Sequence, residues 1–220
     1  NETKKFNVFR KIRFLNSWIS IFTSISLLVI VQPFISLWVG SQYQLSMIVV
    51  CVIVLNYFQK MQRQTYSTFK DSAGIWIEDK FIPLIESFIN LFFSIICLKL
   101  FGFVGVFMGT IISGLTLWCY SYPKFVYKRL FNRSYLDYAK ETIGYILLFI
   151  IVATITYGIS MLFVVNSVLL QVIINIIMCC IIPNLILYII FRKTDNFMYF
   201  KNLIFNIINK IFVKLKKNVC

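Results

Sequence analysis

Histidine is absent from the 220-residue sequence, and only 8 residues are acidic. Without histidine, the chain has no histidine-based general acid–base group and no histidine metal ligand. The six cysteines do not replace it, because most lie inside apolar runs, the last is the terminal Cys220, and no pair has the spacing of a metal site. These cysteines are typical of small apolar packing residues.

Sequence motifs for catalysis and nucleotide binding are also missing. There is no Gly-x-Ser-x-Gly, no P-loop and no Gly-x-Gly-x-x-Gly that opens a helix after a strand. We therefore predict that the chain is not an enzyme and that it has no catalytic residue, no cofactor and no metal.

Long apolar runs are what the sequence has in abundance. Hydrophobic residues make up 60% of the chain and the mean hydropathy is +0.83, whereas a soluble domain is roughly 45–50% apolar. The first apolar run starts at Phe14 and is too long for a secretory signal peptide. The pattern predicts an all-α fold, a polytopic membrane helical bundle. Since the chain begins with Asn1 rather than methionine, we expect it to be part of a longer protein.

Hydropathy divides the chain into a lobe at residues 1–191 and a tail at 192–220. The lobe is predicted to hold six transmembrane helices, at residues 14–39, 45–66, 81–100, 103–122, 143–165 and 168–191. The apolar half of the second span is too short to cross a core of about 30 Å at roughly 1.5 Å per residue, so the helix must continue through its polar half. In the fourth span, Gly105, Gly109 and Ser113 form a pattern of small residues that lets two helices approach closely.

The tail is predicted to form a basic amphipathic helix that lies on an anionic leaflet, and a disordered basic tail is the alternative. Its apolar stripe and its lysines are Phe197, Phe200, Ile204, Ile207, Ile208, Ile211 and Leu215, with Lys201, Lys210, Lys214, Lys216 and Lys217 around them.

The net charge of +14 follows the predicted membrane topology. Of 22 lysines and arginines, all but Lys99 fall in residues 1–13, 60–80, 124–140 and 192–220. Since basic residues concentrate in cytoplasmic segments, we predict a multi-pass protein of the cell membrane with both ends in the cytoplasm and only short outer turns. Because topology explains the charge, no nucleic-acid partner is expected.

A polar stripe on the third span is the first candidate site. Its members fall within a ~100° sector of a helix whose remaining residues are Phe, Ile and Leu. They are Asp79, Pro83, Glu86, Ser87, Asn90, Ser94 and Cys97. We predict coupling or gating roles for Glu86, Asn90 and Asp79, either by ion coupling or by a gate pair between Glu86 and a basic residue. A structural hydrogen bond between helices is the alternative for Glu86.

The polar inner half of the second span is the second candidate site. Arg63, Lys60, Asn56 and Gln59 lie there, and an unpaired charge in mid-bilayer costs on the order of 3 kcal/mol or more. The second and third spans are consecutive and antiparallel, so their polar faces can line one cavity that opens to the cytoplasm. We predict that Arg63 and Lys60 attract a phosphate-bearing substrate, with Asn56 and Gln59 beside them. Alternatively, both basic side chains extend to the inner headgroups.

Four groups of residues, in order along the chain, resemble a known family. They are Pro33-Phe34-Ile35 with Leu37-Trp38-Val39-Gly40; Arg63-Gln64-Thr65 with Thr68-Phe69-Lys70-Asp71-Ser72-Ala73-Gly74; Asp79-Lys80 with Pro83, Glu86 and Asn90-Leu91; and Gly102 with Gly105-Val106-Phe107, Gly109-Thr110 and Ser113. Over residues 1–140 the chain resembles the C-terminal half of bacterial polysaccharide (Wzx-like) flippases, in the multidrug/oligosaccharidyl-lipid/polysaccharide exporter superfamily. Beyond residue 140 the resemblance is one of hydropathy alone.

This resemblance implies a two-lobed helical bundle of which the N-terminal lobe is missing. It implies a substrate of undecaprenyl-diphosphate-linked oligosaccharide, moved from the inner to the outer leaflet by alternating access. Lys70 stands where many relatives have arginine, which keeps the charge but loses bidentate hydrogen bonding. The alternatives are a membrane enzyme of the same pathway, such as a repeat-unit polymerase, or a non-functional fragment. A polymerase needs larger outward loops than this sequence offers.

Overall fold

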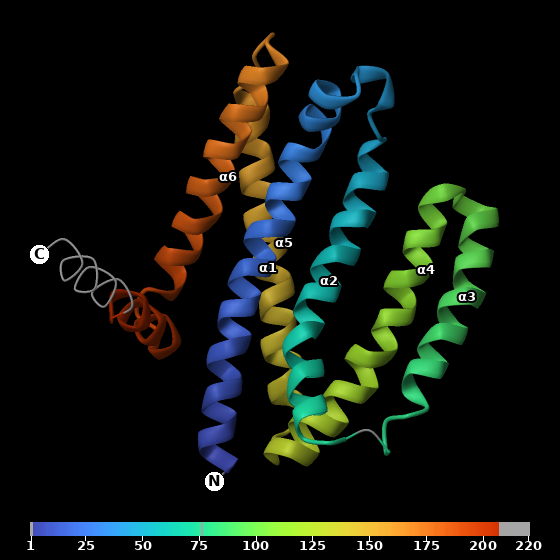
Figure 1. Ribbon diagram of the computed structural model, residues 1–220, viewed down its shortest axis with the longest axis vertical. Coiled ribbons are helices and arrows are strands. Elements are labelled where there is room, and N and C mark those ends of the chain that lie inside the picture. The colour runs from blue at the N-terminus through green and yellow to red at the C-terminus, as the bar shows by residue number, and fades with distance from the viewer. Residues whose placement is uncertain (1, 76, 207–220) are drawn as a thin grey trace, which may run out of the picture. The chain divides into compact units, whose positions relative to one another are not determined.

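The computed structural model describes residues 2–75 and 77–206, in which every regular element is helical (Figure 1). The elements are α1 (Glu2–Trp38), η1 (Ser41–Tyr43), α2 (Met47–Ser72), α3 (Ile82–Phe101), α4 (Phe103–Thr116), η2 (Leu117–Leu130), α5 (Tyr135–Leu162) and α6 (Val168–Phe191). α1 contacts α2 and α5, while α4 contacts α2 on one side and α3 on the other. The predicted all-α membrane bundle is confirmed.

Five helices in the described part of the chain are long and apolar enough to cross a membrane. They are Glu2–Trp38, Ile82–Phe101, Phe103–Leu130, Tyr135–Leu162 and Val168–Phe191. α2 is not among them, because its second half is polar. That helix does continue through its polar half, as predicted, and it ends at Ser72. Buried Gln59, Gln62 and Thr65 lie on this half, and a sixth crossing by α2 stays a prediction.

Two segments that the sequence assigns to basic loops are helical instead. Residues 2–13 belong to α1, and the helix after α4 continues past Pro123 as the π-helical η2. Aromatic burial explains both corrections, since Phe6 and Phe9 on α1 pack against Tyr127 of η2 and so order both segments. Proline has no N–H and its ring clashes with the carbonyl of residue i−4 in an α-helix, and the wider i→i+5 spacing of a π-helix relaxes that clash.

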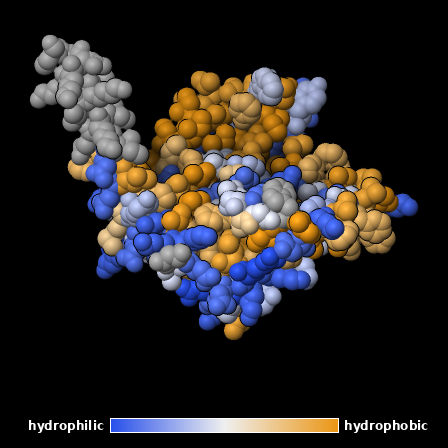
Figure 2. All heavy atoms as spheres, turned by 60° about the horizontal axis from the view of Figure 1, so that its bottom comes forward, coloured by the Kyte–Doolittle hydropathy of each residue, from blue (hydrophilic) through white to orange (hydrophobic). Residues whose placement is uncertain are grey.

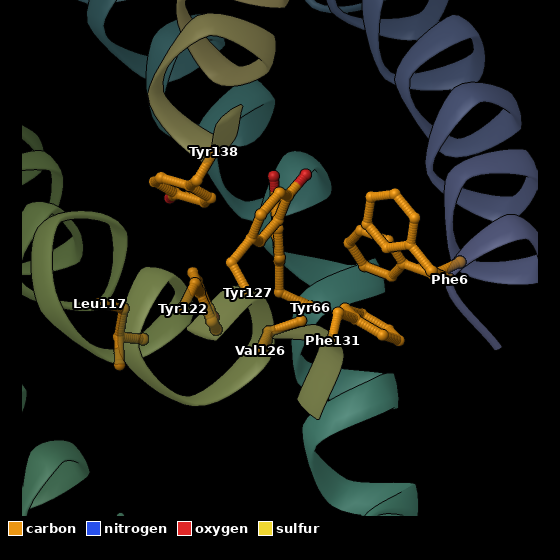
Figure 3. Packing of buried hydrophobic residues seen from close by; sticks show 9 residues of the cluster. Phe6, Tyr66, Leu117, Tyr122, Val126, Tyr127, Phe131 and Tyr138 are labelled. Atoms are coloured by element: carbon orange, nitrogen blue, oxygen red, sulfur yellow. The ribbon is translucent and has the colours of Figure 1, made fainter. Parts of the chain in front are cut away.

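An aromatic core joins α1, α2, η2 and α5 at the end where α1 begins (Figure 3). Its buried members are Phe6, Phe9, Tyr66, Leu117, Tyr122, Val126, Tyr127, Phe131 and Tyr138. The rings meet mostly edge-on or stacked: Tyr66 stacks on Tyr122 with centroids 4.9 Å apart, and Tyr127 meets Tyr138 edge-on at 5.2 Å. These geometries are favoured by the quadrupole of aromatic rings.

Small residues allow α3 and α4 to pack as a close hairpin, which confirms the predicted role of Gly105 and Gly109. A Cβ atom at Gly109 would lie 2.6 Å from the Cα of Ser94, and one at Gly105 would overlap the carbonyl group of Cys97. On its other side α3 is largely exposed, with Leu84, Phe88 and Leu91 uncovered. A face of this composition is suited to lipid.

The chain forms two compact units, Asn1–Asn184 and Leu185–Cys220, and the boundary between them falls within α6. In the second unit, residues 195–206 are helical, and the rings of Tyr188 and Phe197 lie 5.6 Å apart. The predicted tail helix is thus confirmed over this range, and its contact with a leaflet stays a prediction. The remaining tail residues singled out above, Ile207, Ile208, Lys210, Ile211, Lys214, Leu215, Lys216 and Lys217, lie outside the described residues.

The close packing of the α3–α4 hairpin leads to a prediction about glycine substitution. Gly109→Ala should lower the unfolding temperature in detergent, because its methyl group collides with the backbone of Ser94, and overpacking of this kind destabilises by roughly 1–3 kcal/mol. Gly144→Ala is the matched control, since a Cβ at that position would meet no atom within 4 Å, and alanine favours a helix by about 1 kcal/mol over glycine. Equal unfolding temperatures for both variants would contradict the packing.

Candidate functional site

The structure brings together one residue from each predicted site. Arg63 of α2 and Glu86 of α3 form an ion pair, with 2.8 Å between Nη2 and Oε1 and side chains that are 19% and 22% exposed. Gly114 of α4 makes room for this approach, because a Cβ there would lie 2.9 Å from Arg63 Nη1 and 2.5 Å from Gln59 Oε1. The pair is therefore shielded by neighbouring helices and still reachable by water, so its charges interact more strongly than on an open surface.

The other predicted substrate residues lie in different surroundings. Asn56 and Gln59 are buried, and Gln59 Nε2 donates to the carbonyl of Ile111 at 3.1 Å. In the described residues, Asn56 Oδ1 and Gln59 Oε1 are buried acceptors without a donor, which is unfavourable unless a ligand or water supplies one. Lys60, in contrast, is exposed. Asn56 and Gln59 are thus buried and Arg63 is partly buried, whereas Lys60 is exposed.

Asn90 lies where α3 meets α4. Its Nδ2 donates to Ser113 Oγ at 3.1 Å, and Ser94 Oγ donates to Asn90 Oδ1 at 3.4 Å. The polar stripe of α3 therefore faces α4 rather than lipid over this stretch, and Asn90 links the two helices of the hairpin.

Asp79 lies in the turn before α3, not on the helical stripe where the sequence predicts it. It is 3% exposed, pairs with Lys70 at the end of α2 and accepts hydrogen bonds from Ser121 Oγ at 3.1 and 3.2 Å. The reason is that α3 begins only at Ile82, so the turn is free to bend back and bury the carboxylate. Its predicted gating role stays a prediction.

The same turn is attached to η2 by a second, exposed ion pair. Arg129 Nη2 lies 2.6 Å from Glu78 Oε1, and the hydrogen bond from Arg129 lowers the pKa of this carboxyl below its usual value. The pairs Arg63–Glu86, Lys70–Asp79 and Arg129–Glu78 together connect the α3–α4 hairpin and its leading turn to α2 and η2.

Sequence reasoning missed Arg13, the most enclosed charge in the described part of the chain. It is 2% exposed, forms an ion pair with Glu141 and donates from Nη2 to Thr142 Oγ1 at 3.1 Å. Its guanidinium also lies 5.0 Å from the ring centroid of Tyr66, a favourable cation–π distance. The available signal was the spacing of Phe6, Phe9 and Arg13, which continues the helical period of the first span into the supposed basic loop.

Glu141 is held in turn by Tyr127, whose hydroxyl donates to Oε2 at 2.7 Å. Tyr127 also bonds to Arg13, so α1, η2 and α5 meet at one charge-assisted network. Tyr66 of α2 joins the network through Thr142, with 3.4 Å between the two oxygens. No group of three or more cysteine or acidic side chains that could hold a metal occurs in residues 2–75 and 77–206.

The buried network predicts a large effect for Arg13→Ala. The substitution removes a buried guanidinium together with its hydrogen bonds to Glu141, Tyr127 and Thr142, and a hydrogen bond to a charged group contributes roughly 1.5–3 kcal/mol. Chemical unfolding in detergent would measure it. Arg129→Ala is the matched control, since its ion pair is exposed and should contribute little. Similar stability of the two variants would contradict a structural role for the Arg13 network.

Comparison with known proteins gives no relative for this chain. No protein-family model, no curated protein and no solved structure matches it.

Proposed function

We propose that this chain forms one lobe of a flippase that moves lipid-linked oligosaccharide across the cell membrane. The observation that carries the proposal is the partly enclosed Arg63–Glu86 ion pair between two helices of an apolar bundle. Charges inside membrane bundles are rare and mark ion or substrate paths by default. The order of residues that resembles the Wzx-like family supports an undecaprenyl-diphosphate-linked substrate and a missing N-terminal lobe as partner.

The mechanism that we propose uses competition for Arg63. Without substrate, Arg63 is neutralised by Glu86. The diphosphate of the substrate offers several anionic oxygens in a geometry that suits guanidinium, so it can displace the carboxylate. Glu86, then without its cation, becomes a site for a proton or another cation, and its return to Arg63 after release would reset the transporter.

The architecture supports movement of the α3–α4 hairpin as a unit about its junction with η2, into which α4 continues without a break. Its two helices pack backbone to backbone at Gly105 and Gly109, whereas side-chain ion pairs join the hairpin and its leading turn to α2 and η2. The ion pairs with water access, Arg63–Glu86 and Arg129–Glu78, can exchange partners at a modest cost in free energy, while a close-packed backbone contact cannot. This difference is what alternating access requires.

Arg63→Ala tests the proposed phosphate contact. Expressed within its complete protein in a strain that lacks its own polysaccharide flippase, the variant should reach the membrane but reduce surface polysaccharide roughly 10-fold or more, since a charge-assisted hydrogen bond contributes about 1.5–3 kcal/mol. Lys128→Ala removes an exposed basic side chain that forms no ion pair in the described residues, and this variant should export normally. Export at the unsubstituted level by Arg63→Ala would refute a substrate role.

Glu86→Gln separates ion coupling from helix packing. The amide keeps the size and hydrogen bonding of the side chain but has no charge to release, so export should fail even though the protein folds and inserts. Transport rates measured at several external pH values would test this. Undiminished transport by the glutamine variant would leave Glu86 with a structural hydrogen bond only.

A further inference from the structure

A basic pocket lies at the end of the bundle where α1 begins, apart from the Arg63–Glu86 site. Its volume is about 330 Å³. It is lined by Phe6, Arg10, Arg133, Asp137, Lys140 and Glu141. Its three cationic residues are exposed and come from α1, from the turn before α5 and from α5 itself, so they belong to three segments of the chain rather than to one charged helix face.

Two residues that line this pocket, Phe6 and Arg133, are held in place by contacts with the aromatic core. Phe6 is buried and its ring meets that of Phe131 edge-on at 5.2 Å. The guanidinium of Arg133 lies 4.6 Å from the centroid of the Phe6 ring, and the backbone N–H of Arg133 donates to the carbonyl of Tyr127 at 2.8 Å. Asn132, with φ of 50°, provides the left-handed turn that brings Arg133 to this position.

The charge of the pocket is positive. Of its two carboxylates, Glu141 is already engaged by Arg13 and by the Tyr127 hydroxyl. Asp137 is the second, in the first turn of α5. Within residues 2–75 and 77–206, Arg10, Arg133 and Lys140 form no ion pair with any carboxylate. The pocket is therefore lined by three cationic residues and by one carboxylate, that of Asp137, which is not paired with a cation in the described residues.

Two guanidinium groups and an ammonium group that line one pocket in this way suit a phosphate, whose oxygens accept several charge-assisted hydrogen bonds at once. The volume is at the lower end of ligand cavities, which span roughly 300–1,000 Å³, and therefore fits a single phosphate-bearing group. α1 and α5 are both apolar enough to cross a membrane, and hydrophilic side chains gather on the face where α1 begins (Figure 2). Lipid headgroups lie beside the polar ends of helices that cross the apolar core.

We propose that the Arg10–Arg133–Lys140 pocket binds a phosphate group, carried by the headgroup of an anionic phospholipid. The site is separate from the transported substrate and does not depend on the flippase proposal. Bound there, the phosphate bridges the start of α1 to the start of α5.

The test measures binding of short-chain phosphatidylglycerol to the purified chain in neutral detergent. The double variant Arg10→Ala/Arg133→Ala should bind at least tenfold more weakly, because two charge-assisted contacts are lost. Lys128→Ala removes a charge that is as exposed as Arg10 and Arg133 but does not line the pocket, so its binding should stay within about twofold of the unsubstituted chain. Unchanged phosphatidylglycerol binding by the double variant would overturn the proposal.

Two further arms address folding and the source of the phosphate. Arg10→Lys/Arg133→Lys keeps the charge and should restore most of the binding, whereas a folding defect would weaken binding of all lipids, including short-chain diacylglycerol, which has no phosphate. Glycerol 1-phosphate and inorganic phosphate serve as competitors. Weak competition supports a lipid headgroup as the ligand, and competition by inorganic phosphate at the affinity of the lipid would overturn the lipid source.

Discussion

The burial of Arg13 beside Glu141 is the constraint on which the rest of the described bundle depends. A guanidinium that is 2% exposed is tolerable only where a carboxylate, hydroxyl groups and aromatic faces replace its water. Those groups come from α2, η2 and α5, so α1 can bury Arg13 only when all of these elements are in place. A requirement of this kind favours one arrangement of the helices over others that would bury as much apolar surface.

The two sides of the bundle are built by different interactions. At α1, η2 and α5, aromatic rings and a charged network enclose one another with little room for change. The α3–α4 hairpin is close-packed within itself but is joined to its neighbours largely through ion pairs and amide groups. The proposed transporter would use this difference by moving the hairpin against the aromatic half about the α4–η2 junction.

The charged side chains discussed above fall into three groups, which differ in how completely each charge is paired within the protein. Arg13 and Glu141 pair with each other, and the Tyr127 hydroxyl and Thr142 also bond to them. Arg63 and Glu86 neutralise each other yet remain reachable. Arg10, Arg133 and Lys140 line a pocket in which the protein supplies fewer carboxylates than cations. The structural role, the proposed transport role and the proposed lipid site follow from how completely each charge is satisfied within the protein.

Composition and periodicity by themselves determined the class of the protein, the helices and the close approach of α3 and α4, because burial of apolar runs and the absence of a Cβ act locally. They also pointed to Arg63 and Glu86, since charges within apolar runs need partners. Only the tertiary structure decided that these two pair with each other and that Asp79 bends back onto Lys70. It likewise showed that Arg13 is a core residue and that the helix passes Pro123. The reason is that each of these outcomes depends on which elements pack together, whereas a local pattern gives only the face of a helix on which a residue lies.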